Sequence, residues 1–495
     1  MPIYAPYTFV DFPSTSTPIT AARLNTAQTD LRDLAKSGSV VRLSHYTNTT
    51  FGDGATSFDT AFTNAIAALQ AGGMLLVDIP GVLLVSSTIK LPQLCTIQGM
   101  SRYGTQIKAA NASNLHAVIA SDAWIDNDAS FNQFQTIRSL SIDCNGSNQS
   151  SGDGHGIALW CYEAKVEDVL IYGGRGDCVR HSSANRAGTE NGTASECYIL
   201  NSEFRFPTGA GVRSYDPDPT VDSNQADGYI INCQFESVGT YGIQIDHSAG
   251  WTIRGNHLYG LPISGIRCDY VYETSIVDNY IESWGTGTVV GATTAAGIDC
   301  TSFAIGGVVI ANNRLNLIDA LTDADFYPRG IYVRSGASVT AEASITGNKL
   351  HGVTNANTSV GILCETQNNT STLYAELAGN QIRGFDTSIS TVDNTGNLGV
   401  KGRDDYRTIS TNAAVTLYNH EAPNVRHTGT LTANRAVTLS TAGARSGQKI
   451  NITRTGTGAF TLDVGTGPLK SLSTNQWCEV TFDGSAWYLS RYGAL

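Results

Sequence analysis

The chain has few charged residues and no long apolar run. Only 15% of its 495 residues are charged, and the formal net charge is −12. A protein that binds the phosphate backbone needs a basic surface, so we expect no nucleic-acid partner. The longest apolar run, residues 74–89, is interrupted by Asp78, Pro80 and Gly81, so we expect no membrane insertion. The first residues have neither the basic nor the apolar region of a signal peptide, so none is expected.

Paired cysteines are also missing. The ten cysteines are scattered without any Cys-x-x-Cys pair, which indicates neither a zinc site nor a disulfide framework. We interpret them as reduced thiols that serve as small core residues in a protein made in a reducing cytoplasm. The cysteines therefore predict no metal site.

Two short motifs repeat along the middle of the chain. In the first, Gly precedes an apolar residue, which falls at Ile157, Val179, Val212, Ile243, Ile266, Ile298, Ile331 and Ile362. In the second, apolar residues flank an Asn, which falls at Asn256, Asn279, Asn313, Asn348 and Asn380. Two interleaved β-motifs in each repeat of 22–35 residues predict a β-solenoid. In such a fold every strand pairs in parallel with its copy in the next coil. A Leu-rich repeat would need a different Leu pattern, and a propeller would need more even spacing.

The repeated Asn suggests how the coils are joined at a corner. Asn tolerates the left-handed backbone conformation, and its amide can bond to the Asn of the next coil. We therefore expect a ladder of stacked Asn side chains in left-handed corners.

The alternation of side chains along each strand assigns an outer face. If Ile243 and Ile245 point inward, Gln244 and Asp246 point outward. The same register places Asp269 beside Asp246 on the next coil and Asp299 one coil further, one column over. The sequence thus predicts three neighbouring carboxyl groups on the outer wall.

Four features follow one another near the start of the repeats. They are Phe51-Gly52-Asp53-Gly54, a helical pattern over residues 59–70, Gly72-Gly73 and Ile79-Pro80-Gly81. This order resembles the opening of the pectate-lyase-like domains of phage tailspikes and related polysaccharide-degrading proteins. Ser57-Phe58 stands where that family usually has paired Asp. The resemblance implies an all-β fold, a right-handed parallel β-helix over residues 41–403 with a capping helix at about residues 57–71.

The two ends differ from the repeats. In residues 1–40, Leu24, Ala27, Leu31 and Leu34 form a short helical seam, which suggests attachment or self-association, or one amphipathic helix lying on its own domain. Residues 404–495 alternate apolar and polar residues between turns, which predicts an antiparallel β-sandwich. The resemblance implies that this sandwich is a trimerisation, folding or carbohydrate-binding module. Trp477 and Trp487 could stack on sugars, but we expect them in its core.

The acidic cluster suggests glycoside hydrolysis. Carboxyl groups about 5 Å apart suit a retaining mechanism, and about 6.5–9.5 Å leaves room for water and inversion. Asp246 with Asp269 fits the first case, and Asp246 with Asp299 fits the second. A second acidic pair, Glu236 and Glu282, occupies equivalent positions two coils apart with Tyr259 between them. Surface acids more often serve only to solvate a face, so all five remain candidates.

Other polar and aromatic residues could bind the substrate beside these acids. Aromatic rings can stack on sugars, although each could equally pack a corner of the fold. The candidates are Trp160, Arg213, Tyr215, His247, Tyr259, Arg267, Trp284 and Tyr332.

Three functions compete for this arrangement. The first is an endo-glycosidase that cleaves a bacterial capsule, exopolysaccharide or O-antigen. The second is a lyase for uronate-containing polymers, in which the Asp cluster would hold Ca²⁺ and Arg267 or His247 would abstract a proton; otherwise no cofactor is expected. The third is a non-catalytic receptor-binding spike. The resemblance implies a homotrimer in the virion tail that contacts other tail proteins through its N-terminus.

Overall fold

The computed structural model describes residues 40–192, 194–217, 225–287, 294–303, 306–318, 327–353, 359–368, 370–394, 397–401, 406–418, 420 and 422–495. The predicted N-terminal seam lies outside these residues. No helix among them is long and apolar enough to cross a membrane.

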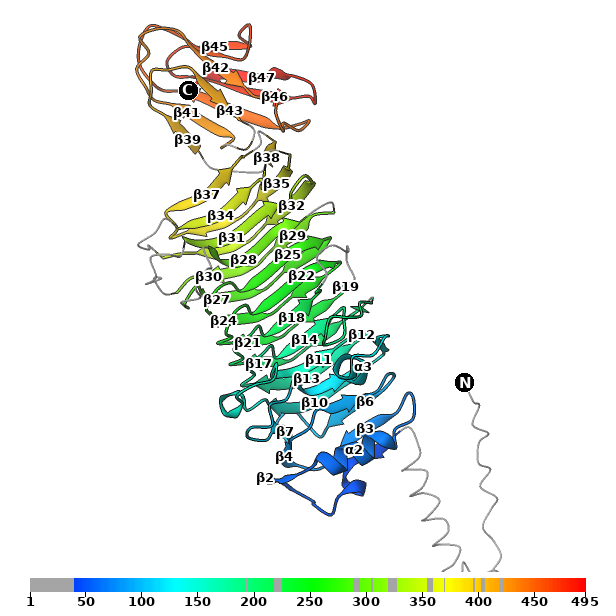
Figure 1. The fold of residues 1–495 in the computed structure, drawn as a ribbon. Coiled ribbons are helices and arrows are strands. Elements are labelled where there is room, and N and C mark those ends of the chain that lie inside the picture. The colour runs from blue at the N-terminus through cyan, green and yellow to red at the C-terminus, as the bar shows by residue number, and fades with distance from the viewer. Residues whose placement is uncertain are drawn as a thin grey trace, which may run out of the picture.

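Most of the described chain winds into an elongated parallel β-helix (Figure 1), which confirms the predicted fold class. Its strands stack in three columns, each pairing in parallel with the strand one coil away. The first column comprises β1 (Val40–Arg42), β3 (Met74–Val77), β6 (Thr96–Gly99), β10 (Thr136–Asp143), β13 (Lys165–Tyr172), β16 (Tyr198–Leu200), β20 (Tyr229–Ile231), β23 (Thr252–Arg254), β26 (Thr274–Val277), β29 (Val308–Ala311), β32 (Thr340–Thr346), β35 (Thr372–Ala378) and β38 (Leu398–Lys401).

The second column belongs to the same sheet, because β10 and β13 bend and run through both columns. Its other strands are β2 (Gly52–Ser57), β4 (Gly81–Val85), β7 (Thr105–Ala109), β17 (Glu203–Arg205), β21 (Gln234–Glu236), β24 (His257–Leu261), β27 (Tyr280–Trp284), β30 (Arg314–Asn316), β33 (Lys349–His351) and β36 (Gln381–Arg383).

The third column forms a sheet of its own and carries the three candidate Asp residues. It comprises β5 (Ile89–Leu91), β8 (Ala117–Ser121), β11 (His155–Leu159), β14 (Val179–Ser182), β18 (Val212–Tyr215), β22 (Ile243–Ala249), β25 (Ile266–Tyr272), β28 (Thr294–Phe303), β31 (Tyr327–Ser335), β34 (Val360–Glu365) and β37 (Thr387–Val392). Short strands lie beside the columns: β9 (Asn132–Gln133), β12 (Cys161–Tyr162), β15 (Ala194–Ser195) and β19 (Gln225–Ala226).

The predicted register of the third column is confirmed. Ile243 pairs with Ile266, which pairs with Ile298, and the series continues through Ile331 to Ile362. All five side chains are fully buried in one core that fills the helix. All ten cysteines are buried free thiols, as predicted; nine lie in the core of the β-helix and Cys478 lies in the core of the C-terminal part.

The Asn ladder is present, but its backbone was predicted wrongly. Asn256 donates from Nδ2 to Oδ1 of Asn279 at 2.9 Å, and Asn279 does the same to Asn313. The left-handed residue is the one before each ladder Asn, for example Asp278 with φ of 58° and Asn312 with φ of 57°. The turn therefore uses the preceding residue for its conformation, which leaves the ladder Asn free to bond between coils.

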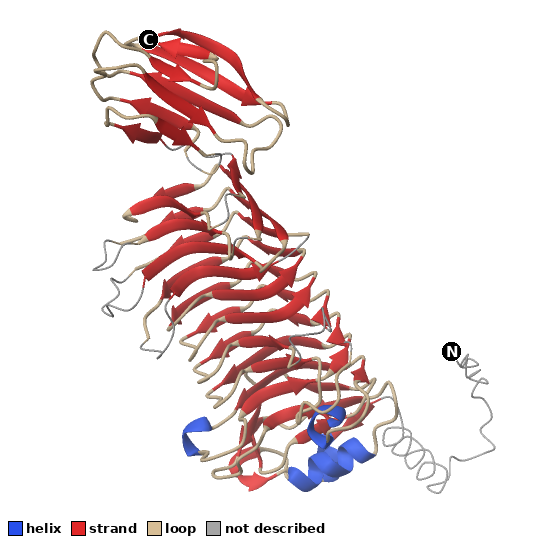
Figure 2. Ribbon diagram, turned by 45° about the horizontal axis from the view of Figure 1, so that its top comes forward, coloured by secondary structure: helices blue, strands red, loops and turns tan. Residues whose placement is uncertain are grey.

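A helix closes the N-terminal end of the β-helix (Figure 2). Helix α2 (Asp59–Ala67) buries Ala61, Phe62 and Ala65 against the first coils, which matches the expected capping helix. The shorter helical segments are η1 (Leu43–Tyr46), α3 (Asp122–Asp126) and η2 (Gly146–Asn148).

The C-terminal part is a two-layer sandwich with its own core. One sheet comprises β39 (Tyr406–Ile409), β41 (Asn424–His427), β43 (Lys449–Arg454), β46 (Gln476–Phe482) and β47 (Trp487–Ala494). The other comprises β40 (Val415–Leu417), β42 (Arg435–Leu439), β44 (Leu462–Val464) and β45 (Lys470–Leu472).

The strand directions in this sandwich differ in part from the prediction. The chain alternates between the two sheets from β39 to β44, so these strands pair in parallel. Only the last strands pair antiparallel. Alternating polarity indicates a two-sided strand but does not determine the direction of its neighbour. Trp487 packs in the core as expected. The same expectation for Trp477 is wrong, because Trp477 is only partly buried and lies outside this core.

Candidate functional site

The three Asp residues lie on consecutive strands of the third column. Asp246 on β22 pairs directly with Asp269 on β25. Asp299 on β28 pairs with Arg267, two residues before Asp269. Since adjacent strands are about 4.8 Å apart, the carboxyl groups come from positions close together on one wall.

Two arginines hold this acidic cluster together. The Nη2 atom of Arg267 lies 3.2 Å from Asp269, and its Nη1 atom lies 3.4 Å from Asp299. Arg213 approaches Asp246 to 3.1 Å, and Nε2 of Gln244 donates to the same carboxylate at 2.9 Å. The arginines lower the cost of stacking like charges, which would otherwise repel on a sheet.

The three carboxyl groups differ in their exposure to water. The side chain of Asp269 is 31% exposed, whereas that of Asp299 is 4% exposed. Burial raises the pKa of Asp299 to about 6, although Arg267 opposes this shift. Burial also raises the pKa of Asp246, and Arg213 opposes it. Among the described residues, Oδ1 of Asp299 has no hydrogen-bond partner, so no donor stabilises the charged form at this atom.

Tyr241 belongs to this site, but we did not predict it from the sequence. Its ring centre lies 5.6 Å from the guanidinium carbon of Arg267. Burial raises the pKa of Tyr241, and its nearby charged groups include Asp299 and Asp246. The available signal was its position: Tyr241 precedes the Gly-apolar motif, where the next repeats have only Ser264 and Ala296.

Several predicted binding residues surround the acidic cluster. Tyr215 is contacted by two guanidinium groups, from Arg180 at 4.7 Å and Arg213 at 4.6 Å from its ring centre. His247 stacks on Tyr270 at 5.1 Å. These rings are therefore fixed by neighbours before any ligand arrives.

The predicted role of Trp160 and Trp284 as exposed stacking platforms is wrong. Trp160 is 1% exposed and packs in a small outer core with Trp124 of α3. Trp284 is 0% exposed, belongs to the main core, and pairs with Leu261. A second layer covers the wall near Trp160, and alternation within one strand cannot reveal such a layer.

Tyr332 points outward but is largely covered. It is 7% exposed and packs with Ala296, Val360 and Leu363. Its hydroxyl donates to Glu365 at 2.6 Å. Tyr332 therefore supports the wall and offers no free ring face.

The second predicted acidic pair lies on another wall. Glu236, Tyr259 and Glu282 follow one another in register in the second column. Arg205 lies 3.3 Å from Glu236, and His257 lies 3.8 Å from Glu282. These acids therefore do not join the Asp cluster, which belongs to the third column.

The Asp cluster does not have the geometry of a cation site. Within the described ranges, no group of three or more His, Cys, Asp and Glu side chains is placed to hold one metal ion. The guanidinium of Arg267 lies against both Asp269 and Asp299, where a cation would need to bind. The residues present thus do not fit the Ca²⁺ of the lyase hypothesis.

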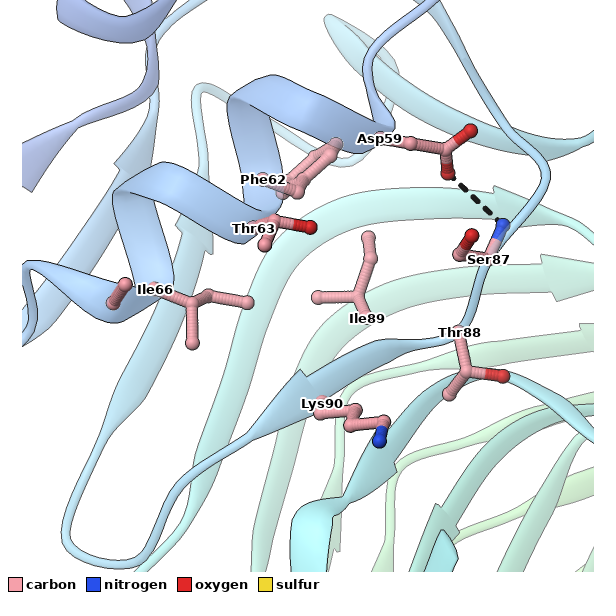
Figure 3. A pocket seen from close by; sticks show the side chains of 9 residues that line it. Asp59, Phe62, Thr63, Ile66, Ser87, Thr88, Ile89 and Lys90 are labelled. Atoms are coloured by element: carbon pink, nitrogen blue, oxygen red, sulfur yellow. Dashed lines mark hydrogen bonds between the residues drawn. The ribbon is translucent and has the colours of Figure 1, made fainter.

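A cavity of about 360 Å³ lies elsewhere, between α2 and β5 (Figure 3). Its lining includes Phe62, Ile66, Ile89 and Asp59, which accepts a hydrogen bond from the backbone of Ser87 at 2.9 Å. Asp59 is the only carboxyl group in this lining. The cavity therefore lacks the pair of acids that glycoside hydrolysis requires.

The middle of the chain matches a known family. Residues 49–289 match the family model described as rhamnogalacturonase A/epimerase, pectate lyase-like, which confirms the pectate-lyase-like resemblance over that stretch. No curated protein sequence matches the chain significantly.

Solved structures with a similar fold include two phage proteins and a bacterial surface protein. Premature gene product 12 of bacteriophage phi29 is 14% identical, with a TM-score of 0.46 over 84% of this chain and 67% of that one. The gp42 tailspike of Acinetobacter phage vb_AbaP_AS12 is 10% identical, with a TM-score of 0.46 over 92% of this chain and 82% of that one. The Streptococcus pneumoniae adhesin PfbA is 14% identical, with a TM-score of 0.46 over 71% of this chain and 100% of that one.

Proposed function

We propose, starting from the pectate-lyase-like match over residues 49–289, that this chain is a phage tailspike depolymerase. It would bind a bacterial surface polysaccharide along the β-helix and hydrolyse it as an endo-glycosidase. The observation that carries this proposal is the contrast between a buried Asp299 and a partly exposed Asp269 on adjacent coils, joined by one arginine. Glycosidases need two carboxyl groups in such different environments.

In this proposal Asp299 is the general acid. Its pKa of about 6 lets it carry a proton that an ordinary surface Asp would have lost. It would donate this proton to the glycosidic oxygen as the bond to the leaving sugar breaks. Asp269, the more exposed carboxylate, would take a proton from the attacking water.

The register favours inversion for this pair. Asp269 and Asp299 are one strand apart and offset by two residues along the strand, which separates their backbones by about 8 Å. A carboxyl separation of this size would leave room for a water molecule beside Arg267, whose guanidinium contacts both carboxylates. Asp246, held by Arg213 and Gln244, would then adjust the charge of the cluster and contact the sugar. Asp246 is also a direct neighbour of Asp269. If Asp246 and Asp269 were the two catalytic carboxyl groups, the reaction would retain the configuration of the sugar.

The lyase hypothesis is less well supported. Arg267 is the proposed base, but its acidic neighbours raise the pKa of its guanidinium further, against the effect of burial. A guanidinium that holds its proton more tightly is a poorer base. The other proposed base, His247, is packed against Tyr270.

The location and assembly are part of the same proposal. We place the chain in the virion tail as a homotrimer, with the N-terminal residues bound to another tail protein and the C-terminal sandwich serving trimerisation or carbohydrate binding. Light scattering of the purified chain would give the mass of the assembly, and a monomer would contradict the trimer.

Products formed from host polysaccharides test the proposed reaction. Purified protein is incubated with capsule, exopolysaccharide and O-antigen from a panel of bacteria. New reducing ends without unsaturated sugars would support hydrolysis. Unsaturated, ultraviolet-absorbing ends would support the lyase. Binding without shortening of any polymer would support a receptor-binding spike.

A further inference from the structure

A basic groove crosses three coils on the second column, away from the Asp cluster. It has a volume of about 410 Å³ and is lined by side chains of β30, β33 and β36. Arg314, Lys349 and Arg383 supply its positive charge, and His351 lies among them. The register pairs Arg314 with Lys349, and His351 with Arg383.

Among the residues that the structure describes, these cations have no acidic partner. Within the described ranges, no carboxylate forms an ion pair with Arg314, Lys349 or Arg383, in contrast to the Arg254–Asp278 pair elsewhere on the same sheet. Like charges on neighbouring strands repel each other. In a chain with a net charge of −12, three unpaired cations in one groove indicate a surface prepared for an anionic ligand.

Aromatic rings continue the groove toward the preceding coils. The guanidinium of Arg314 lies 4.8 Å from the ring centre of Tyr280. Tyr280 stacks on His257 at 4.9 Å, and His257 lies 5.0 Å from Tyr259. Tyr280 therefore has His257 on one side and Arg314 on the other, so these packed rings form the wall beside the cations and hold Arg314 in place.

We propose that this groove binds acidic sugars of the polysaccharide, through carboxylate or phosphate groups held by Arg314, Lys349 and Arg383. Arginine can bind such groups through two parallel hydrogen bonds, and lysine adds a point charge. The groove is a second binding site on a different wall from Asp246, Asp269 and Asp299. It would hold the polymer while the acidic cluster acts on another part of the same chain.

Binding of defined polymers tests this groove. The full chain is titrated at low salt with polygalacturonate, poly(glycerol phosphate) and neutral dextran. We expect at least one anionic polymer to bind, dextran to bind more weakly, and added salt to weaken the anionic binding. The polymer that binds identifies the source of the charge as uronate or phosphate. If neither anionic polymer binds, or if single-stranded DNA binds more tightly than both, the proposal is overturned.

Paired variants separate the groove from the overall charge of the protein. Lys349→Gln with Arg383→Gln should weaken anionic binding by about tenfold or more, because two charge-assisted contacts are lost. Arg42→Gln with Arg186→Gln removes the same charge from exposed sites outside the groove and should leave binding unchanged. The proposed binding site is overturned if both double variants lose anionic binding equally, or if Lys349→Gln with Arg383→Gln causes no loss.

The inference rests on the proposed polysaccharide function, but the two can fail separately. Depolymerisation of the host polysaccharide is measured on the same wild-type sample. Polygalacturonate binding that depends on Lys349 and Arg383 without cleavage of any polymer would contradict the depolymerase and leave the groove. Cleavage of the host polysaccharide, together with anionic binding that is unchanged in the Lys349→Gln and Arg383→Gln double variant, would support the depolymerase and contradict the groove.

Discussion

Arg267 and Asp299 face each other on neighbouring coils, with 3.4 Å between the guanidinium and the carboxylate. The same guanidinium contacts Asp269 at 3.2 Å. One positive charge cannot fully neutralise two carboxylates, and Asp299 is the more buried of the two. The proton therefore stays more readily on Asp299, whose pKa rises to about 6.

Removal of either carboxyl group should abolish most of the activity. We expect Asp299→Asn and Asp269→Asn each to lower turnover by about 10²–10⁴-fold, the usual contribution of a general acid or base. The release of reducing ends measures this effect. Asp278→Asn is the matched control, because Asp278 is an exposed Asp paired with Arg254 on another sheet. Full activity of both site variants would refute their assigned roles.

Activity should also depend on pH through Asp299. Below pH 6 this carboxyl group is mostly protonated and can act as an acid; above pH 6 it loses the proton. We expect kcat/KM to fall about tenfold per pH unit on the alkaline side, because this ratio reports the ionisation of the free enzyme. A profile that stays flat from pH 6 to pH 9 would argue against Asp299 as the acid.

The stability of the fold should depend on the same proton. The pKa of Asp299 rises from 3.8 in the unfolded chain to about 6 in the folded protein. Asp299 therefore contributes about 3 kcal/mol to the free energy of unfolding. This contribution is fully present below pH 4 and is lost as the pH rises through 6. Asn cannot ionise, so Asp299→Asn should gain stability relative to wild type between pH 4 and pH 8. The free energy of unfolding of both proteins is measured at pH 4 and pH 8. If the difference between variant and wild type is the same at both pH values, Asp299 does not have the raised pKa of a buried carboxyl group.

The sequence predicted how the coils stack but not which segments pack over their outer wall. Ile243, Ile266 and Ile298 recur with Gly, and this recurrence was enough to place Asp246 beside Asp269. It could not show that α3 covers Trp160, because that layer comes from an insertion outside the repeat.

The ion pairs within the site were equally hidden from the sequence. Alternation placed Arg267 and Asp299 on the outer face but did not show which neighbours their side chains contact. Their ion pair, and the burial that raises the pKa of Asp299, emerged only from the structure. Tyr241 was missed because it lies just outside the strand pattern. The chemistry of this wall thus depends on side-chain geometry, which a repeat pattern does not contain.

The Asn ladder should be a major source of stability. Asn313 is 1% exposed, and its Oδ1 accepts hydrogen bonds from the backbone and the side chain of Asn279. Asn313→Ala leaves these buried donors unpaired, so we expect a loss of about 2–4 kcal/mol in unfolding free energy. Denaturant unfolding measures the loss. Asn64→Ala, at an exposed position of α2, should cost little, and a similar loss there would deny the ladder its special role.

The residue before each ladder Asn should be sensitive to backbone strain. Asn312 has a φ of 57°, and the equivalent Gly347 has a φ of 67°. Asn and Gly tolerate this conformation, whereas a β-branched side chain does not. Asn312→Gly should therefore be nearly neutral, and Asn312→Val should cost about 1–2 kcal/mol. Ala311→Val introduces the same side chain one residue earlier, inside β29, where strand conformation favours it. If thermal unfolding shows equal destabilisation by both Val substitutions, side-chain bulk and not the left-handed turn determines the cost.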